Sequence, residues 1–211
     1  MPGRRRFLAA LAVCLASAGL AACSGAPGAG DSAASAALST GGAHRFPTPH
    51  ARPSFTLTDT AGAAYHFGTR TGGHPTFLYF GYTRCPDVCP ATMAELGAAL
   101  RAASADAKRD ARVVFVTTNP SHDTPAVIRR WLGNFDRGLP VRFIGLTGSR
   151  AQLTAAQVLA GVPVADDNGQ THSAATSFYG YDDVARVFYL PGDTPATITA
   201  GVDAAADTKG K

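Results

Sequence analysis

Apolar residues along this chain fall into short runs that are typical of buried strands. Residues 76–80 (TFLYF) and 112–117 (RVVFVT) are dense in aromatic and β-branched residues. Two later runs flank a turn-forming stretch at residues 180–183, a pattern that predicts a β-hairpin near the C-terminal part. The predicted strands are residues 54–57, 76–80, 112–117, 141–145, 173–179 and 184–190.

The segments between these runs have helical spacing and helix-starting residues. Apolar residues recur every three or four positions after Asp123, a natural N-cap, while Ser149 and Gln152 have the spacing of a capping box. Strands that alternate with helices predict an α/β fold, a thioredoxin-like three-layer α/β/α arrangement with a mixed central sheet. Helices are predicted from the cysteine-containing segment to about Ala103, from Asp123, and over residues 149–159 and 194–205.

The first residues resemble an export signal. A basic start is followed by sixteen mostly apolar residues (7–22), fewer than the ~20 that a helix needs to cross a bilayer. The stretch ends in Leu-Ala-Ala-Cys, which resembles the bacterial lipoprotein signal and predicts that residues 1–22 are removed and Cys23 is lipidated. Ordinary cleavage that leaves Cys23 free is the alternative. The run Arg-Arg-Arg-Phe-Leu at 4–8 also resembles a twin-arginine signal, so the export route stays open.

Residues 23–50 are rich in Ala, Gly and Ser, which predicts a flexible tether with His44 and His50 in solvent. Residues 51–211 then form one domain, long enough to bury about 70% of the surface of the unfolded chain. The formal charge of the whole chain is +4. Three of the 19 basic residues lie in the signal, so 16 remain against 15 acidic residues. A nearly neutral protein argues against nucleic acid as a partner.

Only Cys85 and Cys89 then remain as thiols, outside the cytoplasmic membrane, where thiols tend to oxidise. They lie at a predicted helix start beside Arg84, a position that favours thiolate. Their three-residue gap places two sulfurs side by side, able to close a disulfide or to hold a soft metal ion. An inert disulfide, thiol redox catalysis and metal binding are therefore the alternatives.

Metal binding needs a third ligand from elsewhere in the fold. A structural zinc site needs four ligands, whereas two sulfurs with one imidazole suit copper. His122 follows a predicted strand, and His172 begins another after a polar turn. Spacing alone leaves both histidines open.

Residues 80–93 (FGYTRCPDVCPATM) closely resemble the signature of the Sco/SenC family, thioredoxin-like copper chaperones for cytochrome c oxidase assembly. The resemblance extends through residues 55–59, 116–120 and 123–125 and to His172. It implies that Cys85, Cys89 and His172 bind copper, as Cu(I) and also as Cu(II). Two departures are Asn119, where the family often has aspartate, and His122, where it more often has arginine.

The resemblance further implies a metallochaperone rather than an enzyme, a monomer that is lipid-anchored at the outer face of the cytoplasmic membrane. Its expected partners are cytochrome c oxidase subunit II and a second copper chaperone. The alternative function is a thiol–disulfide reductase that keeps the acceptor cysteines of the oxidase subunit reduced, with Cys85 and Cys89 as its catalytic pair. Met93 is expected in the core. Asp87 either forms the turn between the cysteines, tunes them or docks a partner.

Overall fold

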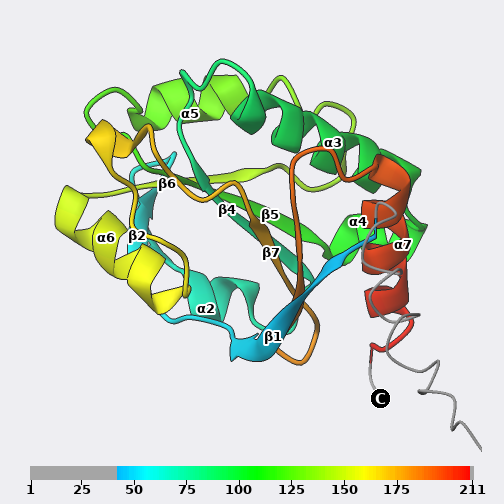
Figure 1. The fold of residues 1–211 in the computed structure, drawn as a ribbon. Coiled ribbons are helices and arrows are strands. Elements are labelled where there is room, and N and C mark those ends of the chain that lie inside the picture. Colours follow the sequence, from blue (N-terminus) through cyan, green and yellow to red (C-terminus); the bar gives the residue numbers. More distant parts are fainter. Residues whose placement is uncertain (1–41, 210–211) are drawn as a thin grey trace, which may run out of the picture.

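The computed structural model describes residues 42–209, so the predicted signal, the lipidation site Cys23 and most of the predicted tether lie outside the described residues. Strands and helices alternate along the chain (Figure 1). The strands are β1 His44–Ala51, β2 Thr56–Asp59, β3 Ala64–His66, β4 Thr76–Gly81, β5 Arg112–Thr117, β6 Ile144–Thr147, β7 Thr176–Tyr179 and β8 Val184–Tyr189. The helices are α2 Phe67–Thr71, α3 Val88–Ala102, α4 Ala105–Asp110, α5 Pro125–Leu132, α6 Arg150–Leu159, α7 Pro195–Ala206 and the 3-10 turn η1 Asp167–Gly169.

All eight strands form one mixed sheet in the order β1-β8-β7-β4-β5-β6-β2-β3. Strands β4, β5 and β6 are parallel, whereas β7 runs antiparallel to β4 and β8 antiparallel to β7. The parallel strands therefore end at one edge of the sheet, where the loop after β4, the loop after β5 and the segment before β7 meet. The predicted α/β fold with a C-terminal hairpin is confirmed.

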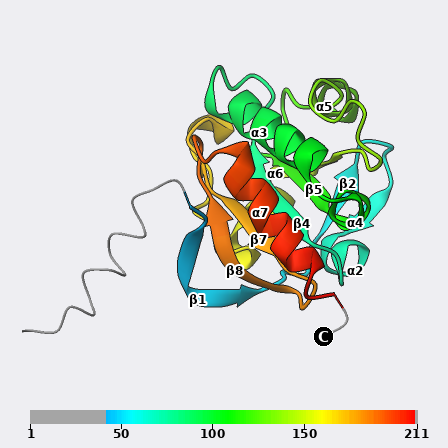
Figure 2. The same cartoon turned by 90° about the vertical axis from the view of Figure 1, so that its right-hand side faces the viewer.

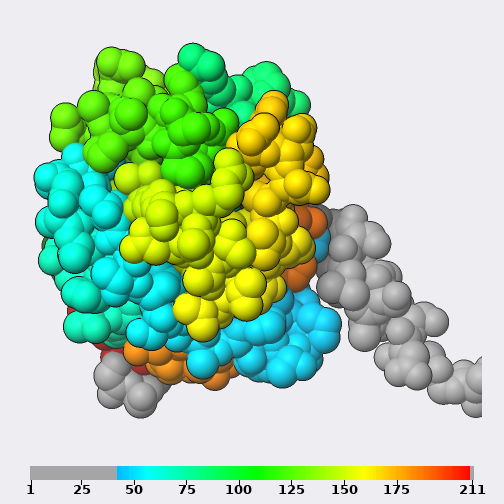
Figure 3. Space-filling model, turned by 90° about the vertical axis from the view of Figure 1, so that its left-hand side faces the viewer, coloured from blue at the N-terminus to red at the C-terminus, as the bar shows by residue number. Residues whose placement is uncertain are grey.

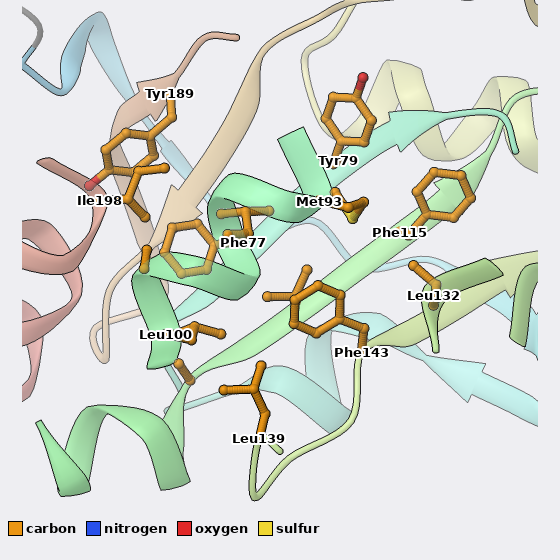
Figure 4. Close-up of a cluster of buried hydrophobic side chains, with 14 of the residues drawn as sticks. Phe77, Tyr79, Met93, Leu100, Phe115, Leu132, Leu139, Phe143, Tyr189 and Ile198 are labelled. Atoms are coloured by element: carbon orange, nitrogen blue, oxygen red, sulfur yellow. The ribbon is translucent and has the colours of Figure 1, made fainter. Parts of the chain in front are cut away.

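Two hydrophobic layers cover the sheet because the side chains of β4 alternate between its faces. Phe77 and Tyr79 pack into a cluster with residues of α3, α4, α5 and α7, drawn in Figure 4. Leu78 and Phe80 pack into a second cluster with residues of α2 and α6. Figure 2 shows α3 and α7 side by side over the first face. The central strand is thus buried on both sides, as expected for a three-layer fold.

The fold begins earlier than predicted. Strand β1 lies within the stretch that the sequence predicts as a tether, and it pairs antiparallel with β8. His44 is not a solvated tether residue, because its Nε2 lies 3.4 Å from Asp193 Oδ1 and its ring stacks on Phe188. His50 packs edge-on against Phe46. The predicted domain boundary at residue 51 is therefore too late.

Helix α5 begins one residue later than predicted. Its N-cap is Thr124, whose side chain accepts a hydrogen bond from the Val127 amide, so the N-cap assignment of Asp123 is wrong. The capping box between Ser149 and Gln152 at the start of α6 is confirmed. No helix within residues 42–209 combines the length and apolar character needed to cross a membrane.

Candidate metal centre

The two cysteines lie where β4 ends and α3 begins. Cys85 sits in a turn closed by its amide, which donates to Tyr82 O at 3.2 Å, and Cys89 lies in the first turn of α3. The Cys89 amide donates to Cys85 Sγ at 3.3 Å. Gly81 makes room for this arrangement, since a Cβ there would lie 2.8 Å from Cys89 Sγ. Cys85 therefore lies in a turn ahead of α3, and Cys89 lies inside the helix.

His172 joins the cysteines from the segment before β7. Its Nε2 lies 3.5 Å from Cys89 Sγ, and the ligand atoms of Cys85, Cys89 and His172 all lie within 4.8 Å of one another. The other ring nitrogen, Nδ1, is 2.8 Å from Ser173 O. Because a carbonyl oxygen only accepts hydrogen bonds, Nδ1 carries the proton and Nε2 directs its lone pair towards the sulfurs.

His122 does not join this cluster. Among residues 42–209, Cys85, Cys89 and His172 form the group of three metal-ligating side chains. His122 lies in the turn after β5, where its amide donates to Asn119 O. The fold therefore places His172, and not His122, beside the two cysteines.

The two thiols differ in their surroundings. Burial opposes ionisation of Cys85, but backbone amides of residues 87–89 around its sulfur outweigh burial and lower its pKa below the ordinary value. Burial raises the pKa of Cys89 to about 12, although the Tyr79 hydroxyl donates to its sulfur at 3.4 Å. In the metal-free protein, the thiolate character expected at this helix start therefore applies to Cys85 and not to Cys89.

We expect iodoacetamide to alkylate Cys85 well before Cys89 in the reduced, metal-free protein. The lowered pKa of Cys85 gives it more thiolate at neutral pH than an ordinary thiol has, whereas Cys89 is fully buried and protonated up to about pH 12. The Cys85 rate should rise with pH and level off below the ordinary thiol pKa. Peptide mass mapping over time measures both sites. Equal alkylation of both cysteines in folded protein would contradict the asymmetry.

An open hollow of about 400 Å³ gives access to the cluster. Cys85 and His172 line it together with the apolar side chains of Tyr82, Pro86 and Val88, whereas Cys89 does not reach it. The acidic side chain at its rim is Asp87, which occupies the N-cap position of α3 without making a side-chain cap. An incoming group therefore meets Cys85 and His172 first. Met93, by contrast, is fully buried in the core, as expected.

The loop that carries Cys85 is held by a buried carboxylate that sequence reasoning placed in another role. Asp123 is fully buried, and it accepts hydrogen bonds from the Thr83 amide (3.0 Å), the Thr83 hydroxyl (2.5 Å) and the Thr117 hydroxyl (2.7 Å). It thus ties the segment before the cysteines to the end of β5. Thr124, the next residue, is equally suited to an N-cap. Its presence is the sequence signal that Asp123 need not cap α5 and can accept hydrogen bonds elsewhere.

Comparison with known proteins agrees with this geometry. The model of the SCO1/SenC family matches residues 44–207. The chain belongs to the SCO1/SenC family. A Stutzerimonas stutzeri relative, named as a candidate copper-binding protein, is 30% identical over 148 residues, which are 67% of this chain and 70% of the relative.

Solved SCO structures share the fold of this SCO1/SenC chain. Copper-bound ScoI of Bradyrhizobium japonicum is 29% identical with a TM-score of 0.62, over 73% of this chain and 98% of that one. Apo Sco1 of Thermus thermophilus is 27% identical with a TM-score of 0.64, over 77% of this chain and 95% of that one. The family and fold expected from the cysteine motif are therefore confirmed.

Proposed function

We propose that this SCO1/SenC protein binds one copper ion through Cys85, Cys89 and His172 and delivers it to the copper centre of cytochrome c oxidase subunit II. The observation that carries the proposal is the approach of two sulfurs and one unprotonated imidazole nitrogen within 4.8 Å. In tetrahedral zinc sites, sulfur and nitrogen ligands lie about 2.3 Å and about 2.0 Å from the ion, and therefore about 3.5 Å from each other. The separation of Cys89 Sγ and His172 Nε2, 3.5 Å, fits one shared ion.

The chemistry of the donor set favours copper. Two thiolates select Cu(I), and the imidazole serves both oxidation states. Three protein ligands are one fewer than a closed zinc site needs. Copper-bound ScoI of Bradyrhizobium japonicum, a relative of the same fold, supports this choice.

Access through the hollow favours transfer by ligand exchange. A thiolate of the acceptor can enter beside Cys85 and His172, bind the ion and replace these two ligands one at a time. Cys89, buried behind them, releases the ion last and takes up a proton as it does so. A second copper chaperone can load the site by the same exchange in reverse.

The placement of the protein is part of the proposal. Lipid on Cys23 would tether a monomeric domain to the outer face of the cytoplasmic membrane. The resemblance of residues 1–23 to a lipoprotein export signal supports this placement.

The second candidate function is a thiol–disulfide reductase. The observation that favours it is the asymmetric cysteine pair: Cys85 is half-buried with a lowered pKa, and Cys89 is buried with a raised one. The Cys85 thiolate can attack a disulfide of the acceptor, which forms a mixed disulfide and releases one acceptor thiol. Cys89 then attacks the Cys85 sulfur, so that a Cys85–Cys89 disulfide forms and the second acceptor thiol is released. This reaction needs no imidazole ligand.

Replacement of His172 by alanine separates the two functions. We expect the reduced wild-type domain to bind one Cu(I) in competition with a chelator, and His172→Ala to bind it at least about tenfold more weakly while still reducing a model disulfide. His122→Ala is the matched control, because it removes a loop histidine outside the cluster. Equal copper binding by all three proteins would remove His172 from the ligand set. Absence of competitive binding in the wild type would leave the reductase.

A further inference from the structure

The segment that precedes His172 is a closed loop of unusual backbone conformation. Residues 166 and 171 bridge each other, with Asp166 N donating to Thr171 O at 2.8 Å and Thr171 N to Asp166 O at 3.3 Å. Inside the loop, Asp167, Asn168 and Gly169 all have left-handed backbone angles, with φ of 48°, 54° and 87°. The two backbone hydrogen bonds close the loop on itself, and His172 is the next residue along the chain.

One side chain connects this loop to the sheet. Thr118, the residue directly after β5, donates from its hydroxyl to Gly169 O at 2.6 Å. Among the hydrogen bonds that the structure gives for residues 166–171, this one leaves the loop, and the others close it on itself or cap η1. The contact is buried, since Thr118 and Gly169 are both buried residues. In the space-filling view of Figure 3, the segments around residues 160–175 lie at the surface of one face.

Thr118 is itself firmly placed. Its amide donates to Gly81 O at 2.7 Å, at the end of β4, directly before the cysteine segment. A Cβ on Gly169 would lie 2.0 Å from Thr118 O, so the loop backbone rests directly on the backbone of Thr118. The neighbouring Thr117 bonds Asp123, which holds Thr83. The hydroxyls of these two consecutive threonines therefore support different halves of the metal cluster. The Thr117 hydroxyl bonds towards the cysteine loop through Asp123, and the Thr118 hydroxyl bonds the loop before His172.

We propose that Thr118 is a positioning residue for the copper site, which sets the place of His172 Nε2 through its hydrogen bond to Gly169. The inference rests on the proposed copper function and adds to it a residue that touches no ligand. Without the hydroxyl, Gly169 O loses its donor and the loop is free to shift on β5. The imidazole then meets the sulfurs less often in the binding geometry, while the cysteine half is unchanged.

The expected effect differs between the oxidation states. Two thiolates alone already bind Cu(I) well, whereas the binding of Cu(II) depends more on the imidazole. Loss of a partner outside the ligand set typically weakens metal binding 10–100-fold. We expect Thr118→Val to weaken Cu(II) binding about tenfold and Cu(I) binding less, and to alter the Cu(II) electron paramagnetic resonance spectrum towards that of His172→Ala.

A double-mutant cycle tests the proposal. Thr118→Val and His172→Ala are made singly and together. The Cu(II) affinity is then measured for the wild type, the two single variants and the double variant. If Thr118 acts through His172, its replacement weakens binding in the wild type and has no further effect once His172 is absent. Thr118→Ser, which keeps the hydroxyl, should restore wild-type affinity. Thr76→Val is the matched control, because it removes a buried hydroxyl that also bonds a carbonyl, at the opposite end of β4.

Two outcomes of this cycle would overturn the proposal. In one, Thr118→Val leaves the Cu(II) affinity unchanged; in the other, it lowers the Cu(II) affinity equally in the presence and absence of His172. A measurement on the metal-free protein tests the positioning role independently of the proposed copper function. Nuclear magnetic resonance relaxation of the His172 ring in the metal-free protein should show increased motion in Thr118→Val and not in Thr76→Val. If the wild type fails to bind copper, the proposed function fails, and an immobile His172 ring in Thr118→Val would separately reject the positioning role.

Discussion

Serine in place of Cys85 or Cys89 is expected to weaken Cu(I) binding by more than about 100-fold, the upper end of what loss of a residue outside the ligand set costs. Each substitution removes one of two soft ligands and leaves a hydroxyl, which Cu(I) binds poorly. Cys85→Ser should be at least as severe as Cys89→Ser. The remaining Cys89 has a pKa of about 12 through burial and must lose its proton to bind the ion.

Anaerobic titration of the reduced domain against a Cu(I) chelator measures this loss. Ser173→Ala, which removes a hydroxyl beside His172 that bonds the Ala175 amide, serves as a control for a local change that spares every ligand. Circular dichroism shows whether each variant is folded. Retention of copper affinity within a few-fold in either cysteine variant would contradict the ligand assignment.

The core of the fold could be predicted because its strands carry their own pattern. Strand β5 has the predicted bounds, and the six residues of β4 are all buried, as a run of apolar residues indicates. Strand β1 could not be found in this way. It includes Pro47 and Pro49, and three of its eight residues are half-buried while the rest are exposed, so its pairing with β8 rather than its own periodicity makes it a strand.

The residues of the candidate site also divide into those that local sequence predicts and those that it does not. Cys85 and Cys89 are visible in the sequence because their spacing and the helix start are local. His172 lies 83 residues beyond Cys89, and only the family resemblance favoured it over His122 before the fold brought it to the sulfurs. The raised pKa of Cys89 depends on burial by distant segments, so helix-terminus reasoning, which is local, missed it.

The support behind the ligands was the hardest part to predict. An aspartate before Thr124 and Pro125 has every local feature of an N-cap, and only the packing of β5 against the cysteine loop gives it other donors. Similarly, Thr118 directly follows an apolar strand, and nothing in the residues around it indicates a hydrogen-bond partner for its hydroxyl. Its partner is a backbone carbonyl 51 residues away, which a sequence pattern does not encode.

The second large effect is expected from Asp123→Ala, which should lower the free energy of unfolding of the metal-free protein by about 3 kcal/mol. The substitution removes the acceptor from the partly buried amide and hydroxyl of Thr83 and from the buried hydroxyl of Thr117. A buried group left unsatisfied costs about 1–3 kcal/mol, and the partly buried groups cost less because water reaches them. It also frees the segment before Cys85, so copper binding should weaken as well.

Urea unfolding followed by circular dichroism measures this change. An unchanged slope of the unfolding free energy against urea concentration would show that the native state stays compact. Asp87→Ala is the matched control, since Asp87 is an exposed acid in the same region without a side-chain cap, and its loss should change stability by less than about 0.5 kcal/mol. A loss below about 1 kcal/mol in Asp123→Ala, within the range of one ordinary hydrogen bond, would show that the carboxylate does not tie the cysteine loop to β5. If instead the loss is large and copper affinity falls with it, the carboxylate supports both the fold and the cysteine half of the site.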